Sequence, residues 1–380
     1  MKIAYVGIIG DLYYSLPLLR LLDEAYGVDF LFFGGKERFL GKEIFALVPE
    51  KSGLKSVRYL KGFYIASRVE CNVPLVRALL KGSYDIIIKD ALGRFMLPVS
   101  FIIAKLLRKK FILRIDIYRH PATLFHYFSK GALRFICRHA DAICAYGVHV
   151  RDFVVSLGAS PEKVFVLPYA VDSALFDKEV TAQEKEELKK TLGLQGKKII
   201  LYVGRMVEEK GLRYLIEAYR QCRGGDKALV MIGDGKYKEA IKRLVAKLKL
   251  ENVVLLAHIP HGELYKYYAA ADLFVLPSIV NRWFFESWGM VINEAMSQGL
   301  PVIVSGSVGA VRAGLVKDNV NGLVVQEKNV SEIAHALNRL LSDEIMRRKM
   351  SEESKAIIGA YTPRKMFEAF QHAIEYVGRQ

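Results

Sequence analysis

The sequence predicts an α/β protein built from two Rossmann-like, doubly wound domains that face a cleft. Three observations lead to this prediction: the length, a series of short apolar runs separated by helical patterns, and a second such series after a charged stretch. At 380 residues the chain exceeds a single typical core. Strands that alternate with helices form a parallel sheet covered on both faces. Ligands of such sheets bind beyond the carboxyl ends of the strands.

The first series predicts an N-terminal domain over residues 1–178. Its apolar, strand-like runs are 2–7, 28–33, 84–89, 110–115, 141–146 and 163–168. Helical patterns over 94–108 and 147–157 lie between some of these runs. The segment 172–198 differs, because it holds the charged helical run "TAQEKEELKKTLGL" and no buried strand. We therefore expect it to link the two domains.

The second series predicts a C-terminal domain over residues 179–361. Its strand-like runs are 197–204, 227–233, 252–257, 272–277 and 300–305, and the helices are expected to begin near 210, 236, 262, 288 and 330. The last segment, 362–380, has an amphipathic helical pattern opened by Pro363. We expect this helix to cross back onto the first domain.

Charge and composition limit the classes of partner. The formal net charge is +16, and residues 1–178 hold 26 Lys and Arg against 16 Asp and Glu. A basic N-terminal half favours an anionic substrate, an anionic membrane surface or nucleic acid, although no nucleic-acid-binding module is recognisable. The N-terminus lacks a signal-peptide pattern and no apolar run reaches about 18 residues, so we expect a cytoplasmic protein. Few Asn and Gln beside frequent Lys and Glu are compatible with a thermophilic source.

The cysteines and the neighbouring histidines predict no metal site. The four cysteines are scattered without a CxxC motif: Cys71, Cys137, Cys144 and Cys222. This pattern is typical of reduced thiols in a core. His258 and His261 lie close in sequence, but no Cys or further His accompanies them. We expect neither a metal ion nor a cofactor.

A candidate anion clamp follows the first strand of the C-terminal domain. In "RMVEEKG", Arg205 and Lys210 lie about one turn apart around a strand-to-helix loop. A helix N-terminus attracts anions through its free N–H groups and its dipole, and two cations there would suit a diphosphate. The alternative is an exposed Arg and Lys that pair with Glu208 or Glu209. After the next strand, Gly233 in "IGDGKY" would let the backbone approach a ligand closely, or would merely turn the chain.

Two glutamates eight residues apart, Glu286 and Glu294, stand beside one of the most apolar strands. If a helix starts near Ser287, they are separated by roughly 12 Å along its axis. They could then hold hydroxyl groups at the two ends of an elongated ligand such as a nucleotide-sugar. The N–H groups around Gly289 and Met290 would face the part between them. The alternative is an ordinary helix with a solvated glutamate and an acidic residue at its N-terminus.

Taken together, these motifs resemble the retaining glycosyltransferases of family 4, which have the GT-B architecture of two Rossmann domains. The resemblance covers nearly all of 1–380, is densest over 196–325, and rests on "YVGRMVEEKG", "VMIGDG", "ADLFVLPS", "ESWGMVINEAMSQGLPVIVS" and "VNGLVV", in the family's order. It implies that Arg205 and Lys210 hold the donor diphosphate. It also implies that Glu294 binds the ribose hydroxyls and Glu286 the transferred sugar, with the N–H groups of residues 287–291 assisting. Catalysis without an essential metal ion is implied as well.

The N-terminal half departs further from the family's pattern. Family members carry a Gly-Gly turn after the first strand, and in "GIIGD" Gly10 is the counterpart. Where they often carry a His, this sequence offers Asp116, with His120 four residues later. Asp116 would orient the donor sugar or stabilise positive charge developing at its anomeric carbon. The alternative is a strand-end Asp that pairs with Arg114 or Arg119.

The hypothesis is therefore a hexosyltransferase that moves a hexose-type sugar from a nucleotide-diphosphate sugar to a glycan or lipid-linked acceptor. The resemblance implies front-side attack with retention. The segments 57–68 and 104–111 mix Lys and Arg with apolar or aromatic residues, as membrane-interfacial segments do. We accordingly expect a peripheral position at the inner face of a membrane. The alternatives are a non-hydrolysing nucleotide-sugar epimerase and a non-catalytic nucleotide-sugar-binding protein.

Overall fold

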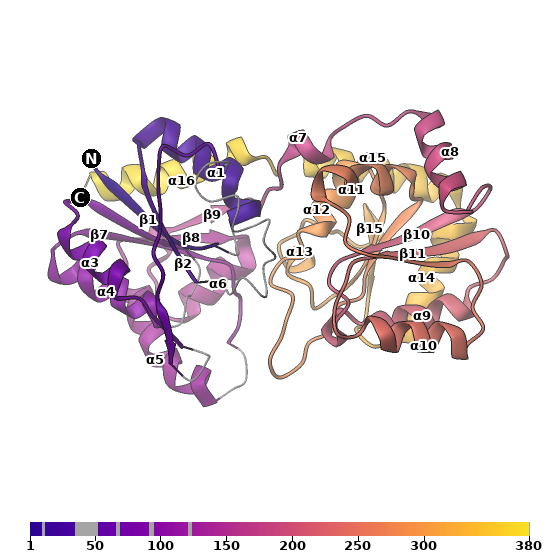
Figure 1. The fold of residues 1–380 in the computed structure, drawn as a ribbon, viewed down its shortest axis with the longest axis horizontal. Helices are drawn as coiled ribbons and strands as arrows, with labels where there is room; N and C mark the ends of the chain where they lie inside the picture. Colours follow the sequence, from indigo (N-terminus) through magenta and orange to yellow (C-terminus); the bar gives the residue numbers. More distant parts are fainter. Residues whose placement is uncertain (10–11, 35–51, 66–68, 91–94, 121–123, 380) are drawn as a thin grey trace. The chain divides into compact units, whose positions relative to one another are not determined.

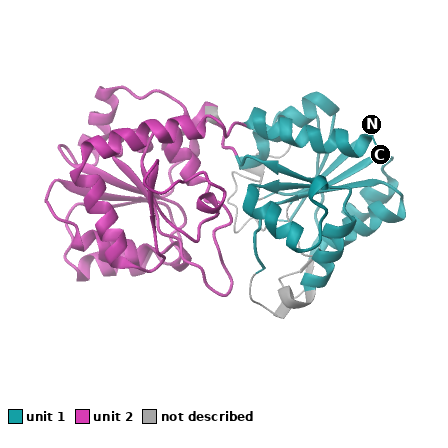
Figure 2. Ribbon diagram, turned by 180° about the vertical axis from the view of Figure 1, so that it is seen from behind, with its two compact units in different colours: residues 1–169, 363–380 teal, residues 170–362 magenta. Residues whose placement is uncertain are grey.

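The computed structural model describes residues 1–9, 12–34, 52–65, 69–90, 95–120 and 124–379. The chain divides into two compact units (Figure 2): the N-terminal unit holds residues 1–169 and 363–380, and the C-terminal unit holds residues 170–362. Each unit is built around one large parallel sheet (Figure 1). The predicted fold class, two Rossmann-like doubly wound α/β domains, is confirmed.

The N-terminal unit contains a seven-stranded parallel sheet with the order β3-β2-β1-β6-β7-β8-β9. Its strands are β1 (Ile3–Ile8), β2 (Asp29–Phe33), β3 (Ser56–Tyr59), β6 (Ile86–Asp90), β7 (Lys110–Ile115), β8 (Ala142–Tyr146) and β9 (Val164–Leu167). All six apolar runs predicted in this half are strands. The edge strand β3 and the antiparallel pair β4 (Phe63–Ile65) and β5 (Val69–Cys71) were not predicted. The four residues of β3 are half-buried or exposed, so their sequence lacks an apolar run.

Helices cover both faces of this sheet. They are α1 (Leu12–Tyr26), α3 (Val73–Lys81), α4 (Met96–Leu106), α5 (Leu124–His139), α6 (Val148–Ser156) and α16 (Pro363–Gly378), with a 3₁₀ turn, η2 (Pro161–Lys163), before β9. The connection through α1 leads towards one edge of the sheet, and those through α3 to α6 lead towards the other. Right-handed crossovers therefore place α1 on one face and α3 to α6 on the opposite face. In Figure 1, α16 lies on the same side as α1.

The C-terminal unit contains a six-stranded parallel sheet with the order β12-β11-β10-β13-β14-β15. Its strands are β10 (Lys198–Val203), β11 (Lys227–Ile232), β12 (Val253–Leu256), β13 (Leu273–Leu276), β14 (Val302–Ser305) and β15 (Gly322–Val325). Its helices are α7 (Ser173–Phe176), α8 (Ala182–Thr191), the 3₁₀ turn η3 (Glu208–Lys210), α9 (Leu212–Gln221), α10 (Lys238–Lys247), α11 (His261–Ala270), α12 (Val291–Ser297), α13 (Gly309–Arg312), α14 (Val330–Ser342) and α15 (Glu344–Ile358). Helix α8 opens with a complete capping box formed by Thr181 and Glu184.

The division between the units falls at 169/170, nine residues before the expected boundary at 178/179. The reason is the packing of α7. The buried ring of Phe176 lies 6.2 Å from the ring of Tyr268 and 6.5 Å from that of His261, both on α11. The side-chain amide of Gln298 donates to the carbonyls of Phe176 and Lys178. These contacts attach residues 170–178 to the C-terminal unit.

The helix expected to start near Ser287 begins later, at Val291, so that prediction was wrong. Gly289 has a φ of +93°, which lies in the left-handed region. A residue with this backbone conformation cannot be part of a right-handed α-helix, so the helix begins after it. The N–H of Gly309 donates to the carbonyl of Glu286, and that of Ala310 donates to the carbonyl of Trp288. These bonds hold residues 286–288 against the start of α13. Glu286 therefore does not share a helix with Glu294, and the separation based on helical rise does not apply.

We predict that Gly309→Ala destabilises the C-terminal unit by about 2 kcal/mol or more. A Cβ atom at Gly309 would lie 1.7 Å from the carbonyl oxygen of Ser287, so the backbone around Glu286 would have to move. The matched control is Gly131→Ala in the middle of α5, where an added Cβ has no neighbour within 4 Å. That change should stabilise by up to about 1 kcal/mol. Urea unfolding measures both, and equal effects of the two changes would contradict the prediction.

Candidate functional site

The strand order of the C-terminal sheet reverses between β10 and β13. β10 pairs with β11 on one side and with β13 on the other, all in parallel. The loops that leave these strands at their carboxyl ends therefore start next to each other, at the point where open α/β sheets bind ligands. The loop after β10 carries Arg205 and Lys210, and the segment after β13 carries Glu286. The topology thus places three of the predicted site residues at one location.

Lys210 and Glu286 form an ion pair, with Lys210 Nζ on Glu286 Oε2. Only 10% of the Lys210 side chain and 14% of the Glu286 side chain are exposed. The hydroxyl of Ser278, one residue beyond the Pro277 that follows β13, donates to the same carboxylate oxygen at 3.0 Å. Lys210 Nζ also lies 5.6 Å from the centre of the Phe284 ring. The alternative in which Lys210 pairs with Glu208 or Glu209 is therefore wrong.

A glycine fixes the position of Lys210. Gly211 has a φ of +69°, and a Cβ atom there would lie 2.0 Å from the carbonyl oxygen of Pro277. The N–H of Ile279 donates to the carbonyl of Glu209 at 2.9 Å. The turn that ends in Lys210 is thus held against the chain that leaves β13. A larger residue at position 211 would push these two backbones apart.

Arg205 is exposed, and its backbone is anchored by the buried Tyr202, whose hydroxyl donates to the carbonyl of Arg205 at 2.8 Å. Burial raises the pKa of Tyr202 well above its ordinary value. Glu286 raises it further, and Arg205 opposes the shift. The charges of Arg205 and Glu286 therefore both act on one phenol group. Within the part of the chain that the structure describes, Arg205 makes no ion pair, so its guanidinium is available to an anionic ligand.

Gly233 and Gly235 let two loops approach each other closely. Their φ angles are +144° and +153°, and a Cβ atom at Gly233 would lie 2.0 Å from the carbonyl oxygen of Gly204. At Gly235 it would lie 2.3 Å from the carbonyl oxygen of Met206. The N–H of Met206 donates to the carbonyl of Asp234 at 2.7 Å. In this structure the close approach is thus to the neighbouring loop, and it holds the loop that carries Arg205.

Glu294 lies in a separate, enclosed cluster on α12. Its side chain is completely buried, and the hydroxyl of Tyr268 donates to Oε2 at 2.7 Å. His261 Nε2 lies 4.0 Å from Oε1. Burial, with a smaller contribution from His258, lowers the pKa of His261 to about 4, so the ring is neutral at pH 7 and this approach is not an ion pair there. The N–H of Glu294 donates to the carbonyl of Met290, the residue that caps α12.

In the N-terminal unit, Asp116 directly follows β7 and is half-buried. Its charge contributes to the raised pKa of Tyr146, although burial is the main cause and Arg114 opposes it. Arg114, one of the two partners that the alternative interpretation gave Asp116, pairs instead with Asp90 at 3.0 Å. Gly10, the expected counterpart of the family's Gly-Gly turn, lies outside the described residues.

The sequence analysis did not predict the buried polar cluster around Arg114. This buried side chain pairs with Asp90 and donates to the hydroxyls of Tyr5 and Ser15. The ring of Tyr146 lies 4.8 Å from its guanidinium carbon. Burial alone would lower the pKa of Arg114, but Asp90 and the neighbouring phenol groups raise it above its ordinary value. The signal that could have found the cluster is an Arg inside the apolar run "KFILRI", because such a charge requires a buried partner.

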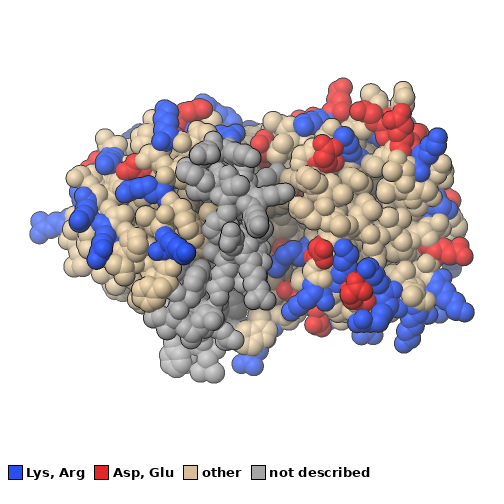
Figure 3. Space-filling view, in the orientation of Figure 1, with Lys and Arg blue, Asp and Glu red and all other residues tan. Residues whose placement is uncertain are grey.

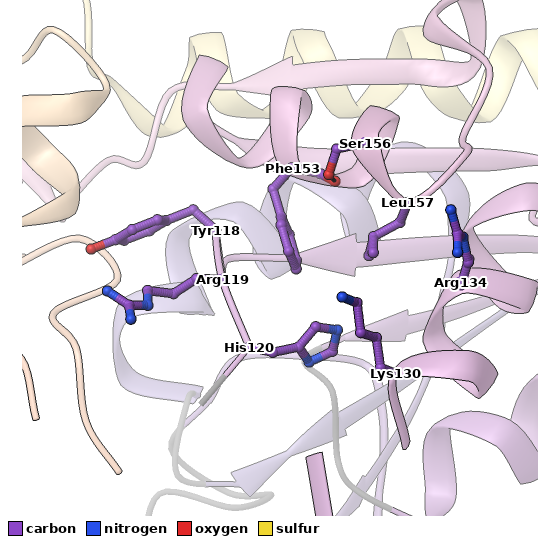
Figure 4. Close-up of a pocket in the computed structure, with 8 residues that line it drawn as sticks. All are labelled: Tyr118, Arg119, His120, Lys130, Arg134, Phe153, Ser156 and Leu157. Carbon is purple, nitrogen blue, oxygen red and sulfur yellow. Dashed lines mark hydrogen bonds between the residues drawn. The ribbon is translucent and has the colours of Figure 1, made fainter. Parts of the chain in front are cut away.

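A basic cavity of about 420 Å³ lies beside the segment that follows Asp116 (Figure 4). It is lined by Tyr118, Arg119, His120, Lys130, Arg134, Phe153, Ser156 and Leu157. Lys130 and Arg134 are one turn apart on α5, and within the described residues neither has a carboxylate within ion-pair distance. In Figure 4, His120 and Lys130 lie close together, whereas Arg119 points away from Lys130. None of the described residues that line the cavity carries a carboxylate, so it is suited to an anionic group.

Two negative findings concern the described residues alone. They contain no group of three or more His, Cys, Asp or Glu side chains placed to hold a metal ion. None of their helices combines the length and the apolar character that a membrane crossing needs.

Residues 184–357 match the family model described as glycosyl transferases group 1. The match lies within the C-terminal unit and includes Arg205, Lys210, Glu286 and Glu294. The C-terminal unit is therefore similar to group 1 glycosyltransferases.

Three curated relatives carry transferase names. The chain is 35% identical over 198 residues to the "Uncharacterized glycosyltransferase MJ1607" of Methanocaldococcus jannaschii. The aligned residues are 51% of this chain and 49% of the relative. It is 31% identical over 250 residues to an alpha-D-kanosaminyltransferase of Streptomyces kanamyceticus, covering 64% and 63% of the two chains. It is 30% identical over 220 residues to a GDP-mannose-dependent alpha-(1-6)-phosphatidylinositol monomannoside mannosyltransferase of Mycolicibacterium smegmatis, covering 57% and 56%. The chain thus spans about half to just under two thirds of these relatives.

Among solved structures, the Anabaena protein HepE in complex with UDP is similar with a TM-score of 0.80. The sequence identity is 20%, and the similarity covers 99% of this chain and 100% of HepE. At this identity the likeness shows the fold alone. The fold class that the sequence predicts, two Rossmann-like domains, is therefore shared with this solved structure.

We predict that the half-buried, neutral His261 makes stability depend on pH. Its folded-state pKa of about 4 lies below the ordinary value of 6.5, so the unfolded chain binds the proton more readily between these values. The contribution of His261 is complete above about pH 6.5 and is lost as the pH falls through about 4, a loss of roughly 3 kcal/mol.

The measurement is the free energy of unfolding across this pH range for the wild type and for His261→Gln. The variant should lack this part of the pH dependence, whereas His335→Gln, at an exposed position on α14, should retain it. Identical slopes for wild type and His261→Gln would contradict the assignment.

Proposed function

We propose that the chain is a retaining glycosyltransferase that moves a hexose-type sugar from a nucleotide-diphosphate sugar to a glycan or lipid-linked acceptor. The observation that carries the proposal is the site at the β10/β13 reversal, where Lys210, Glu286 and Arg205 come together. It is supported by the family match over 184–357 and by the transferase names of the relatives. UDP in crystals of HepE supports a nucleotide-sugar as the donor.

The proposed donor contacts follow from charge and position. Arg205 and Lys210 bind the diphosphate, because one guanidinium and one ammonium can neutralise both phosphates. Glu286, released from part of its pairing with Lys210, accepts hydrogen bonds from hydroxyls of the transferred sugar. The backbone N–H groups around Gly289 and Met290 assist, and Gly233 supports the loop of Arg205. For Glu294, whose Oε2 accepts a hydrogen bond from Tyr268, we propose contact with the ribose hydroxyls.

In the proposed reaction, the bond between the anomeric carbon and the diphosphate oxygen breaks, and its electron pair stays on the leaving diphosphate. An acceptor hydroxyl forms the new bond to the same face of the anomeric carbon, and its proton passes to an oxygen of the leaving phosphate. Arg205 and Lys210 stabilise the growing negative charge by preorganised electrostatics. We propose that Asp116 stabilises the positive charge on the sugar ring, and that no metal ion is essential.

For the acceptor, we propose a molecule that carries an anionic group. The basic cavity supports this, since Lys130 and Arg134 line it and no carboxylate of a described residue pairs with them. One relative is named for a phosphatidylinositol monomannoside acceptor, which is a phosphate-bearing lipid. A lipid-linked acceptor would bring the protein to a membrane surface from the cytoplasmic side.

We predict acceptor-free release of one nucleotide when the protein is offered UDP-, GDP- and ADP-sugars. Arg205→Ala and Glu286→Gln should each lower kcat/KM by roughly 10- to 100-fold, the effect of losing one charge-assisted hydrogen bond. The matched control is Arg213→Ala on α9, an exposed arginine that pairs with Glu217 outside the site. It should leave hydrolysis unchanged.

Other outcomes of this assay would overturn the proposal. Isomerised donor without nucleotide release would identify an epimerase. Absence of both turnover and donor binding in calorimetry would identify a non-catalytic protein. If the Arg205→Ala variant were as active as the wild type, the proposed site would take no part in the reaction.

We further predict that transfer to an acceptor retains the anomeric configuration of the donor and continues in excess EDTA. Retention follows from attack on the face that the leaving group vacates, and EDTA resistance follows from charge neutralisation by Arg205 and Lys210 alone. Proton NMR of the transfer product reads the anomeric configuration of the new glycosidic bond. An inverted product, or activity lost in EDTA and restored by Mg²⁺ or Mn²⁺, would contradict this mechanism.

A further inference from the structure

Helix α4 has an apolar outer face. Its sequence, "MLPVSFIIAKL", contains one charged residue, Lys105. A helix that is apolar on all sides is usually buried on all sides. The inner face of α4 is buried against the sheet and its neighbouring helices, but Ile102 is 52% exposed and Leu106 is 75% exposed. Phe95, seven residues before Ile102 and therefore on the same face, is also exposed.

The neighbouring helices extend this surface. On α5, Phe135 is 55% exposed, and its ring meets that of Phe101 edge-on at 6.0 Å. On α3, Leu80 is half exposed. α3, α4 and α5 cover the same face of the N-terminal sheet (Figure 1). We call their outer surface, with Leu80, Phe95, Ile102, Leu106 and Phe135, the α3–α5 surface.

The charges that these three helices carry have one sign, and Lys105 pairs with Asp141, which lies outside the helices, at 2.7 Å. None of the three helices contains an Asp or Glu, and together they carry Arg77, Lys81, Lys105, Lys130, Arg134 and Arg138. Arg108 and Lys109 lie just beyond α4, after Leu107. In the view of Figure 3, the part of this unit over α3 and α4 is tan and blue, and the red atoms lie above it.

We infer that the α3–α5 surface docks on an anionic lipid bilayer. Lys and Arg are attracted to anionic headgroups, and exposed aliphatic and aromatic side chains enter the boundary between headgroups and acyl chains. α4 then lies in the plane of the membrane surface. The apolar and basic residues act together, since neither the charge nor the small apolar area alone gives stable attachment.

Other occupants fit the surface less well. A symmetric dimer through this surface would place the same basic residues opposite each other, because both copies use the same patch. Nucleic acid would use the cations but would leave Ile102 and Leu106 exposed to water. The inference deepens the proposed function by naming the partner surface at which a lipid-linked acceptor is met. Vesicle binding needs no sugar transfer, so the failure of either proposal is distinguishable from the failure of the other.

The test is co-sedimentation of the full chain with vesicles of phosphatidylglycerol and phosphatidylcholine in equal parts, at low salt. The wild type should bind these vesicles and should not bind pure phosphatidylcholine. Ile102→Asp/Leu106→Asp should lower the partition coefficient by about tenfold or more, because it places two negative charges at the lipid boundary. The matched control is Ile345→Asp, which changes an 83% exposed isoleucine on α15 of the C-terminal unit and should leave binding unchanged.

A second arm tests the charges. Arg108→Glu/Lys109→Glu should lower binding by about tenfold and make the remaining binding less sensitive to salt. The control is Arg348→Glu, an exposed arginine on α15. Circular dichroism and acceptor-free donor hydrolysis should be unchanged in all of these variants, which excludes misfolding as the cause.

Three results would overturn the inference. The first is the absence of wild-type binding to anionic vesicles at low salt. The second is equal binding by the wild type and Ile102→Asp/Leu106→Asp. The third is a dimer in light scattering that this variant dissociates while vesicle binding persists, which would assign the surface to a contact between two copies.

Discussion

Lys210 can lie beside Glu286 only because β10 and β13, distant in the sequence, are neighbours in one parallel sheet. Their adjacency is the reversal point of the strand order, and both following segments leave the same edge. Two backbone contacts then set the distance between them: Gly211 against the carbonyl of Pro277, and Gly309 against that of Ser287. The ion pair, the exposed Arg205 and the route of residues 286–290 all depend on this close packing of backbone.

The two units hold their buried charges differently. In the N-terminal unit, Arg114 is enclosed by Asp90, Tyr5, Ser15 and Tyr146, and it is fully buried. Breaking such a pair would leave an uncompensated charge in the core, so this cluster stabilises a specific arrangement of strands. In the C-terminal unit, the Lys210–Glu286 pair keeps some exposure and lies beside an exposed arginine. A ligand can exchange partners with this second pair at lower cost, which is what a binding site requires.

The sequence predicts most of the fold because buried parallel strands are continuous apolar runs. Every run named in the N-terminal half is a strand, and the C-terminal runs correspond to β10, β11, β12, β13 and β14. The start of α12 was misjudged because hydrophobic spacing does not reveal the left-handed φ of Gly289 or the hydrogen bonds from Gly309 and Ala310. Likewise, no local pattern shows that Tyr268 reaches Glu294 or that Asp90 reaches Arg114. Such contacts depend on which strands and helices become neighbours, and the spacing of residues along the chain does not contain that information.

The helix α16 has a consequence for the order in which the molecule can be completed. It buries Met366, Phe367, Phe370, Ala373, Ile374 and Val377 in the N-terminal unit, and Tyr376 packs on Phe165 of β9. During synthesis, residues 170–362 are added to the chain before these side chains exist. Until then the sheet of the N-terminal unit lacks part of one covering layer, while the C-terminal unit already has its entire sequence. The unit whose first residues are translated first therefore cannot complete its fold until the other unit has been translated.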